Sequence, residues 1–163
     1  MTHASLAVYG SHIPILVKIL GNTDGKILDL GVGLSTIVMH AMATQTKRPI
    51  VSYESDKKWY EANLVYQSDF HQIKFVEDWN KADIDNEFWD VVLIDHHPAR
   101  RRIEEVKRLA NKANYILPHD SDIFNKFYTQ SGIYPLFKYR YDYTRCFPNT
   151  VVLSNTTDLS NLK

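Results

Sequence analysis

Acidic and imidazole side chains follow two apolar runs of the sequence, and these residues are the best suited to chemistry. Asp95 ends residues 89–95 and is followed by His97, while His119 and Asp120 come shortly after residues 115–117. Histidine titrates near neutral pH and can therefore act as a general base. Carboxylate and imidazole groups can also bind Mg²⁺, Mn²⁺ or another divalent ion. The structural alternative is that Asp120 caps the following helix and His119 satisfies a buried turn.

A glycine-containing loop follows the first apolar run. Its sequence is Asp-Leu-Gly-Val-Gly-Leu-Ser-Thr over residues 29–36, with Gly31, Gly33 and Ser35 as candidate ligand contacts. Glycine allows a sharp turn and a close approach of the backbone to a ligand, and the next helix offers free N–H groups at its start. The third glycine of the dinucleotide fingerprint is missing. A purely structural strand-to-helix turn would use similar residues.

Three further residues extend the candidate ligand site. Glu54 ends the second apolar run about 20 residues after the glycine loop, where an acidic side chain can accept both hydroxyls of a ribose. The alternative for Glu54 is a carboxylate that is stabilised at a helix N-terminus. Asp78 can accept the exocyclic amine of adenine, and the ring of Trp79 can cover the base. The alternative to adenine binding is a structural role, in which Asp78 is a turn residue and Trp79 anchors the chain at the surface.

Apolar runs and helical patterns alternate along the chain and must position these residues. The pattern predicts strands over 26–30, 49–54, 73–76, 89–95, 115–117, 136–143 and 150–154, and helices over 13–20, 35–42, 57–66, 100–111 and 122–130. Such alternation indicates an α/β fold with a doubly wound, mostly parallel seven-stranded sheet and a C-terminal antiparallel strand pair. We expect one domain over residues 1–163. Ligands bind at the carboxyl ends of the strands in such sheets.

The ordered set of motifs resembles class I SAM-dependent methyltransferases, where SAM is S-adenosylmethionine. The resemblance is carried by Asp-Leu-Gly-Val-Gly, Glu54, Asp78-Trp79, Asp95 and the two terminal strands, and it spans about three-quarters of the chain. It implies SAM as cofactor, with Gly31, Gly33 and Ser35 beneath the methionine part, Glu54 on the ribose, Asp78 and Trp79 around the adenine, and Asp95 also in contact. Ser35-Thr36 replaces a glycine often found in this loop. The first helix would cover the cofactor, but no role is assigned to Tyr9, Ser11 and His12 before it.

A second likeness concerns Asp-His-His-Pro over residues 95–98 and His-Asp at 119–120. Small-molecule O-methyltransferase-like subfamilies are similar here, and the likeness implies that Asp95, His97, His119 and Asp120 converge above the SAM methyl group. His97, His119 and Asp120 are then the expected catalytic residues, with His97 or His119 as base. A divalent metal is possible but not favoured.

The expected reaction is methyl transfer from SAM to an unidentified acceptor, most simply a hydroxyl on a small molecule. The alternatives are another SAM-using enzyme, such as an aminopropyl transferase, and a non-catalytic SAM-binding domain acting through a partner. The chain is short for this fold and has no evident substrate-capping insertion. Two further possibilities therefore stay open: a large acceptor, and a homo-oligomer in which a second subunit completes the site.

The amino-acid composition of the chain limits the partners and the compartment that we expect. Lys plus Arg and Asp plus Glu number 19 each, so we expect neither nucleic acid nor a membrane surface as partner. The single cysteine, Cys146, and the absence of a signal-peptide pattern favour a cytoplasmic protein. In the run Arg100–Arg102, we expect Arg102 on a solvated helix face, while Arg100 or Arg101 can bind an anionic substrate group near Asp95.

Overall fold

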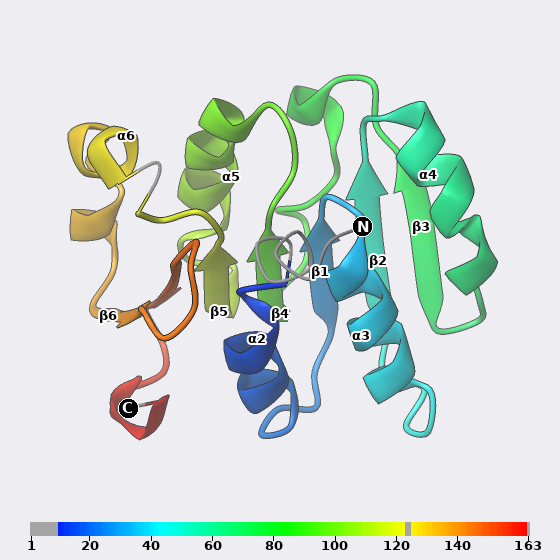
Figure 1. Ribbon diagram of the computed structural model, residues 1–163, viewed down its shortest axis with the longest axis horizontal. Helices are drawn as coiled ribbons and strands as arrows, with labels where there is room; N and C mark the ends of the chain where they lie inside the picture. Colours follow the sequence, from blue (N-terminus) through cyan, green and yellow to red (C-terminus); the bar gives the residue numbers. More distant parts are fainter. Residues whose placement is uncertain (1–9, 123–124, 163) are drawn as a thin grey trace.

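A computed structural model of the chain describes residues 10–122 and 125–162 (Figure 1). Tyr9 therefore lies outside the described residues. The α-helices are α2 (Ile13–Leu20), α3 (Leu34–Ala43), α4 (Lys57–Asn63), α5 (Arg102–Leu109) and α6 (Asn125–Gln130). The strands are β1 (Ile27–Leu30), β2 (Ile50–Glu54), β3 (His71–Phe75), β4 (Trp89–Ile94), β5 (Ala113–Pro118), β6 (Tyr139–Tyr143) and β7 (Thr150–Ser154). Short 3₁₀ helices are η1 (Leu64–Tyr66), η2 (Trp79–Lys81), η3 (Ala99–Arg101), η4 (Tyr134–Leu136) and η5 (Ser160–Leu162).

The seven strands form one sheet in the order β3-β2-β1-β4-β5-β7-β6. The ladders among β1 to β5 are parallel, whereas β7 runs antiparallel to both β5 and β6. The predicted α/β class, the mostly parallel sheet and the C-terminal antiparallel pair are therefore confirmed. Because β1 lies between β2 and β4, the loop after β1 is flanked by the ends of those two strands.

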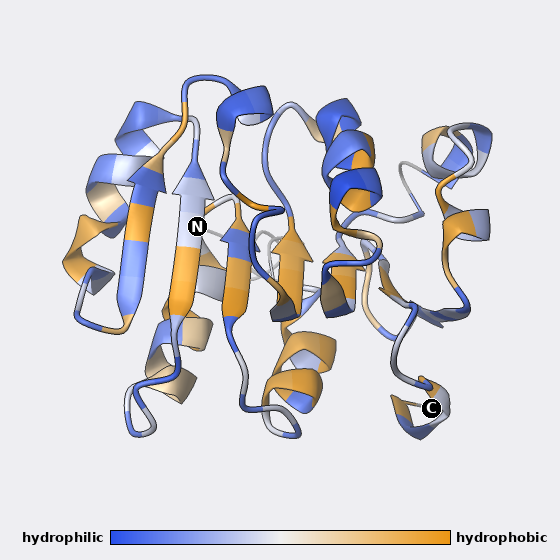
Figure 2. Cartoon of the chain, turned by 180° about the vertical axis from the view of Figure 1, so that it is seen from behind, coloured by the Kyte–Doolittle hydropathy of each residue, from blue (hydrophilic) through white to orange (hydrophobic). Residues whose placement is uncertain are grey.

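Two apolar layers cover the two faces of the sheet. Residues that alternate along a strand point to opposite faces. Val91 and Leu93 of β4 accordingly pack with α2 and α3, while Val92 and Ile94 pack with α5. Both layers consist of side chains that are almost fully buried. Figure 2 shows the apolar colour concentrated on the central strands and polar residues on α5.

Several element boundaries differ from the prediction. β3 begins at His71 rather than residue 73, because His71 and Gln72 pair with Ile50 and Val51 of β2 although neither continues an apolar run. The helix predicted over 57–66 is α-helical to Asn63 and then tightens into η1. The helix predicted from residue 100 begins with η3, and α5 proper starts at Arg102. Helix α6 is described from Asn125 onward.

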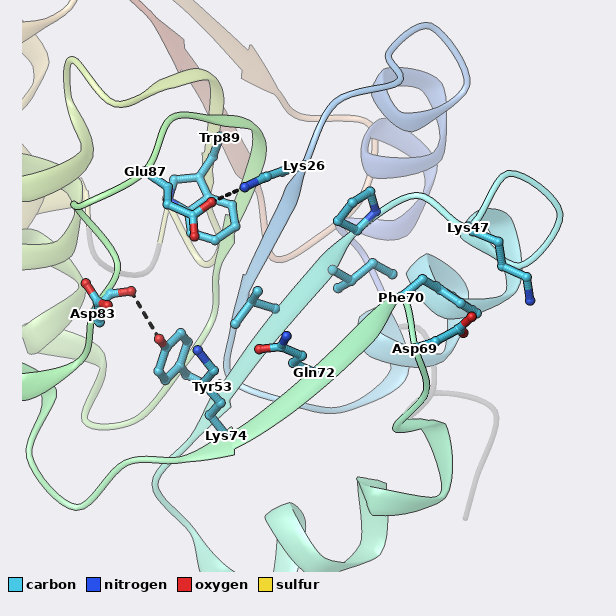
Figure 3. A pocket seen from close by; sticks show the side chains of 13 residues that line it. Lys26, Lys47, Tyr53, Asp69, Phe70, Gln72, Lys74, Asp83, Glu87 and Trp89 are labelled. Carbon is cyan, nitrogen blue, oxygen red and sulfur yellow. Dashed lines mark hydrogen bonds and ion pairs between the residues drawn. The ribbon is translucent and has the colours of Figure 1, made fainter.

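The connection from β3 to β4 leaves part of one sheet face open. Residues 76–88, all of them described, contain the short η2 and no α-helix. A hollow of about 270 Å³ lies beside β2 and β3 and includes Lys74, Tyr53 and Trp89 among its lining residues (Figure 3). Its walls include the starts of β2 and β4, away from the strand ends that carry the candidate site. Among the described helices, none combines the length and apolarity that crossing a membrane requires.

Candidate functional site

The predicted site residues gather where the parallel strands end. Gly31 directly follows β1, Glu54 is the last residue of β2, Asp95 follows β4, and His119 follows β5. These four strands are neighbours in the sheet and parallel, so their carboxyl ends form one edge. This edge is where ligands bind in open α/β sheets.

The two glycines of the loop serve different purposes. Gly31 has φ +101°, and a Cβ there would lie 2.7 Å from the backbone nitrogen of His96 and 2.8 Å from the carbonyl carbon of Asp95. Glycine at this position therefore lets the loop pack directly against the chain leaving β4. A Cβ on Gly33 would meet no protein atom within 4 Å in the described structure. The space beside Gly33 can therefore accept a ligand.

Thr36 ties the glycine loop to a buried carboxylate. The Gly33 amide donates to Thr36 Oγ1 at 2.9 Å, and Thr36 Oγ1 donates to Asp29 Oδ2 at 2.6 Å. Ser52 Oγ donates to the same Asp29 oxygen at 2.9 Å. Burial raises the pKa of Asp29 to about 7 despite these two hydrogen bonds. Thr36 thus has a defined role in holding the loop, and its neighbour Ser35 is buried. Ser35 and Thr36 are the pair that stands where this loop often has a glycine.

The same polar network continues away from the loop. Ser52 Oγ lies 2.9 Å from His71 Nε2, and His71 Nδ1 lies 3.1 Å from His40 Nδ1. Burial, aided by the nearby His40, lowers the pKa of His71 to about 4. A neutral imidazole thus lies next to the serine that contacts Asp29. This hydrogen-bonded network could not be predicted from the sequence, because His71 stands outside the predicted strand.

The Glu54 carboxylate accepts hydrogen bonds from three backbone amides in two segments of the chain. Its Oε2 accepts a hydrogen bond from the Val32 amide of the glycine loop at 3.0 Å. Its Oε1 accepts the Ser55 and Asp56 amides, each at 2.7 Å. The residue Glu54 is 7% exposed. Glu54 therefore fixes the loop against the end of β2, and its ribose role stays a prediction.

Asp78 and Trp79 form the start of η2. Asp78 caps this short helix by accepting the Asn80 amide at 3.0 Å, and that hydrogen bond lowers the pKa of Asp78. The Trp79 ring stacks on His96 with centroids 4.0 Å apart, and its Nε1 donates to the His97 carbonyl at 3.0 Å. Because Trp79 is 6% exposed, the surface-anchor alternative is wrong. Contact of either residue with adenine stays a prediction.

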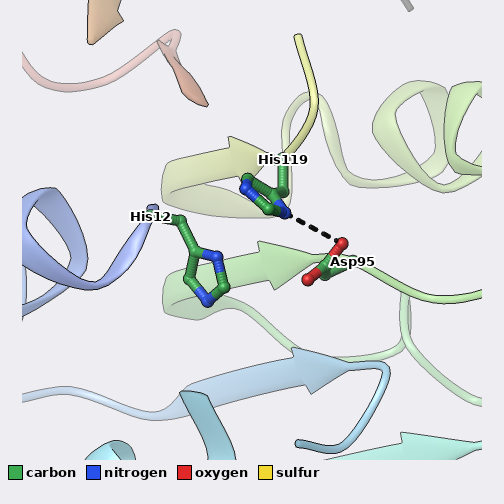
Figure 4. A group of neighbouring side chains, drawn as sticks. All are labelled: His12, Asp95 and His119. Carbon is green, nitrogen blue, oxygen red and sulfur yellow. Dashed lines mark ion pairs between the residues drawn. The ribbon is translucent and has the colours of Figure 1, made fainter. Parts of the chain in front are cut away.

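The predicted convergence of Asp95, His97, His119 and Asp120 is only partly present. His119 Nδ1 lies 3.2 Å from Asp95 Oδ1 and 3.6 Å from Asp120 Oδ1. The side chain of His97 is exposed, and the expectation that it joins this group is wrong. His12, which precedes α2, lies there instead. Its ring centroid is 4.4 Å from that of His119, and Figure 4 shows the three side chains His12, Asp95 and His119 together.

The imidazole of His119 is held on both sides. Ser11 Oγ lies 2.8 Å from His119 Nε2, opposite the Asp95 contact. His12 is 1% exposed, and burial, with the nearby His119, lowers its pKa to about 4. Neither ring nitrogen of His12 has a hydrogen-bond partner within the described residues. Burial opposes ionisation of Asp95, but the contact with His119 and the charge of Arg102 outweigh it and lower the pKa of Asp95.

The expectation that Arg102 lies on a solvated helix face is wrong. It is 2% exposed rather than solvated, and its guanidinium pairs with Asp95 and Asp120, both at 2.9 Å. It also donates to the carbonyls of His96, Asp95 and His119 at 2.9 to 3.3 Å. Arg102 is the first residue of α5, so it lies beneath the ends of β4 and β5, whose carbonyls need donors. Asp120 therefore pairs with Arg102 in this structure.

The neighbouring arginines point elsewhere. Arg101 donates to Glu105 at 2.9 Å and to Asn80 at 2.8 Å. The guanidinium of Arg100 lies 4.7 Å from the centre of the Phe127 ring. Binding of an anionic substrate group by either residue stays a prediction.

The chain was compared with protein-family models, curated protein sequences and solved structures. Neither a protein-family model nor a curated protein sequence matches this chain. Solved structures do match it at low identity. A putative O-methyltransferase from Klebsiella pneumoniae aligns with a TM-score of 0.63 and 12% identity, covering 91% of this chain and 80% of that one.

Two human methyltransferase structures are also similar. Human methyltransferase-like protein 13 in complex with SAH aligns with a TM-score of 0.58 and 14% identity, over 90% of this chain and 79% of that one. The hMettl16 catalytic domain, in complex with a 3′UTR hairpin, aligns with a TM-score of 0.57 and 12% identity, over 90% and 69%. The chain therefore has the Rossmann-like fold of class I methyltransferases.

Proposed function

We propose that this chain is a SAM-dependent methyltransferase that acts on a hydroxyl group of a small molecule. The observation that carries the proposal is one edge of the sheet, where the glycine loop, Glu54, Asp95 and His119 follow four adjacent parallel strands. The methyltransferase fold of the similar structures supports the same activity. The small-molecule acceptor rests on the balanced charge of the chain, which favours no extended anionic partner.

The residues at this edge fit SAM. Gly33 faces open space on the loop between β1 and α3, where a Cβ would begin to fill the cradle. The Glu54 carboxylate lies beside this loop, at the position that suits the ribose hydroxyls. Gly31, Gly33 and Ser35 would border the methionine part, and Asp78 with Trp79 the adenine. SAM would supply an electrophilic methyl group.

The chain's own contribution to transfer would be positioning and proton acceptance. Holding an acceptor in line with a methyl group removes much of the entropic barrier. His119 is oriented by Ser11 on one side and Asp95 on the other, with Asp120 nearby. A hydroxyl proton would pass to this group. The adjacent Asp95 carboxylate would stabilise the resulting imidazolium, because opposite charges attract strongly in a partly buried site.

Calorimetric titration with SAM, with NAD as the control ligand, tests the proposal. We expect micromolar binding of SAM and none of NAD. Gly33→Asn should weaken SAM binding at least tenfold without lowering the melting temperature, because asparagine is a favourable N-cap and its side chain meets open space. Glu54→Gln should weaken SAM binding as well. Absence of SAM binding by the wild-type chain would refute the proposal.

The acceptor needs a separate assay. Release of S-adenosylhomocysteine would be followed with pools of small hydroxyl compounds, and with RNA hairpins and protein substrates in parallel. We expect turnover with a hydroxyl compound. Turnover with RNA or protein alone would overturn the acceptor class while leaving the methyltransferase activity in place.

A further inference from the structure

The cluster of His12, Asp95 and His119 contains an unusual buried group. One ligand atom from each residue lies within 4.8 Å of the others, at the start of α2 and the ends of β4 and β5 (Figure 4). Buried polar groups nearly always have a hydrogen-bond partner. Within the part of the chain that is described, neither ring nitrogen of His12 has a hydrogen-bond partner, while His119 Nδ1 lies 3.2 Å from Asp95 Oδ1. The two ring nitrogens of His12 thus have no donor or acceptor assigned to them, and the third nitrogen at the site, His119 Nδ1, faces the Asp95 carboxylate.

We propose that His12, Asp95 and His119 bind one divalent first-row transition metal ion. Two imidazole nitrogens and one carboxylate are typical ligands for Zn²⁺, Fe²⁺ or Co²⁺, whereas Mg²⁺ and Ca²⁺ prefer oxygen ligands. The 3.2 Å between His119 Nδ1 and Asp95 Oδ1 already matches two ligands of one ion, which lie roughly 3–3.5 Å apart for bonds of about 2.1 Å. The ligand atom of His12 lies within 4.8 Å of the other two, so its ring has to move closer to complete the set.

The surroundings of the cluster match those of a metal site. A metal-binding histidine usually donates its other ring N–H to a neighbouring group, and ligating carboxylates are themselves hydrogen-bonded. Ser11 Oγ lies 2.8 Å from His119 Nε2 and can accept its proton, which leaves Nδ1 unprotonated as a ligand. Arg102 holds Asp95 Oδ1 at 2.9 Å. Its charge is shared with Asp120, so one positive group faces two carboxylates beside the site.

The position of the site gives it a use in the proposed reaction. Three protein ligands leave coordination positions for an exchangeable molecule, and a bound ion lowers the pKa of a coordinated hydroxyl. This use rests on the proposed function, and with an ion bound His119 serves as a ligand rather than as the proton acceptor. Metal binding itself rests on the cluster alone. The ion would lie at the sheet edge where the acceptor is expected to bind.

Titration of the untagged, chelator-stripped chain with Co²⁺ tests the site, monitored by calorimetry and by visible absorption of the bound ion. We expect one Co²⁺ per chain with micromolar or tighter affinity and no competition from millimolar Mg²⁺. His12→Gln and Asp95→Asn should each lower the affinity at least 100-fold. Ser11→Ala should lower it 10- to 100-fold. His97→Gln, which alters an exposed imidazole next to the cluster, should leave the affinity unchanged.

Circular dichroism of the metal-free variants checks that they fold. Should His12→Gln not fold, imidazole resonances of the wild-type chain decide the question, since Zn²⁺ should shift those of His12 and His119 and leave that of His97. No stoichiometric binding, or an equal loss in His97→Gln and His12→Gln, would overturn the site. A SAM titration of the same samples separates the two proposals, because a chain that binds Co²⁺ but not SAM keeps the metal site and loses the proposed function.

Discussion

The buried carboxyl group of Asp29 makes the stability of the fold depend on pH. Its pKa is raised from 3.8 to about 7, chiefly by burial, so between these values the folded chain holds a proton that the unfolded chain has lost. Stability therefore falls as pH rises through this window and levels off above pH 7. Asp29→Asn removes the titration and keeps an oxygen that can accept the Thr36 and Ser52 hydroxyl groups. The wild-type chain should thus lose stability relative to this variant as pH rises.

The magnitude follows from the two pKa values. One pKa unit corresponds to about 1.4 kcal/mol. Between pH 5 and pH 8, the linkage gives a relative gain of about 2.5 kcal/mol for Asp29→Asn over the wild-type chain. The neighbouring His71 has a lowered pKa, so it makes the fold more stable as pH rises towards 6.5. It is present in both proteins, and its contribution cancels in the difference.

Urea denaturation of both proteins at pH 5 and pH 8 measures this gain. Asp85→Asn is the matched control. Hydrogen bonding to Arg108 lowers the pKa of Asp85, so the contribution of Asp85 to stability is complete above pH 5. The difference in stability between Asp85→Asn and the wild-type chain should therefore be the same at pH 5 and pH 8. A difference between Asp29→Asn and wild type that is equal at the two pH values would refute the reasoning, since Asp29 would then be ionised throughout.

Three further substitutions test the glycine loop, the buried arginine and the candidate base. Gly31→Ala should lower the free energy of unfolding by about 2–4 kcal/mol in urea denaturation, through left-handed strain and overlap with backbone atoms; an unchanged midpoint would contradict the tight packing. Arg102→Met should cost about 3–5 kcal/mol, because two carboxylates lose their shared cation, and a melting temperature equal to wild type would argue against that pairing. His119→Asn should reduce methyl transfer at least 100-fold with an accepted substrate while SAM affinity stays within twofold; retained turnover would assign His119 a structural role.

The strand ends were the part of the site that the sequence could predict. Apolar runs place Glu54, Asp95 and His119 at the ends of parallel strands, and parallel strands bring such ends to one edge. His12 could not be found in this way. It precedes α2, and its approach to His119 depends on how that helix packs against the sheet, which no local pattern records.

Arg102 is a different case, because a signal for its burial was present. It stands four residues before Val106 and seven before Leu109, both fully buried, and residues at these spacings share a helix face. The run of three arginines suggested solvent, but the phase of α5 selects one of them to point inward. Trp79 likewise became a core residue by stacking on His96, a contact between segments 17 residues apart in sequence.

The position of β7 has a consequence for how the chain folds during synthesis. Of the seven strands of the sheet, β7 is the last to emerge from a ribosome, yet it lies between β5 and β6 and all five of its residues are buried. Until residues 150–154 are made, β5 keeps an unpaired edge and β6 has no neighbour within the sheet. An exposed strand edge is a template for pairing with other chains. We therefore expect nascent or prematurely terminated chains lacking β7 to be the species that aggregates or recruits chaperones.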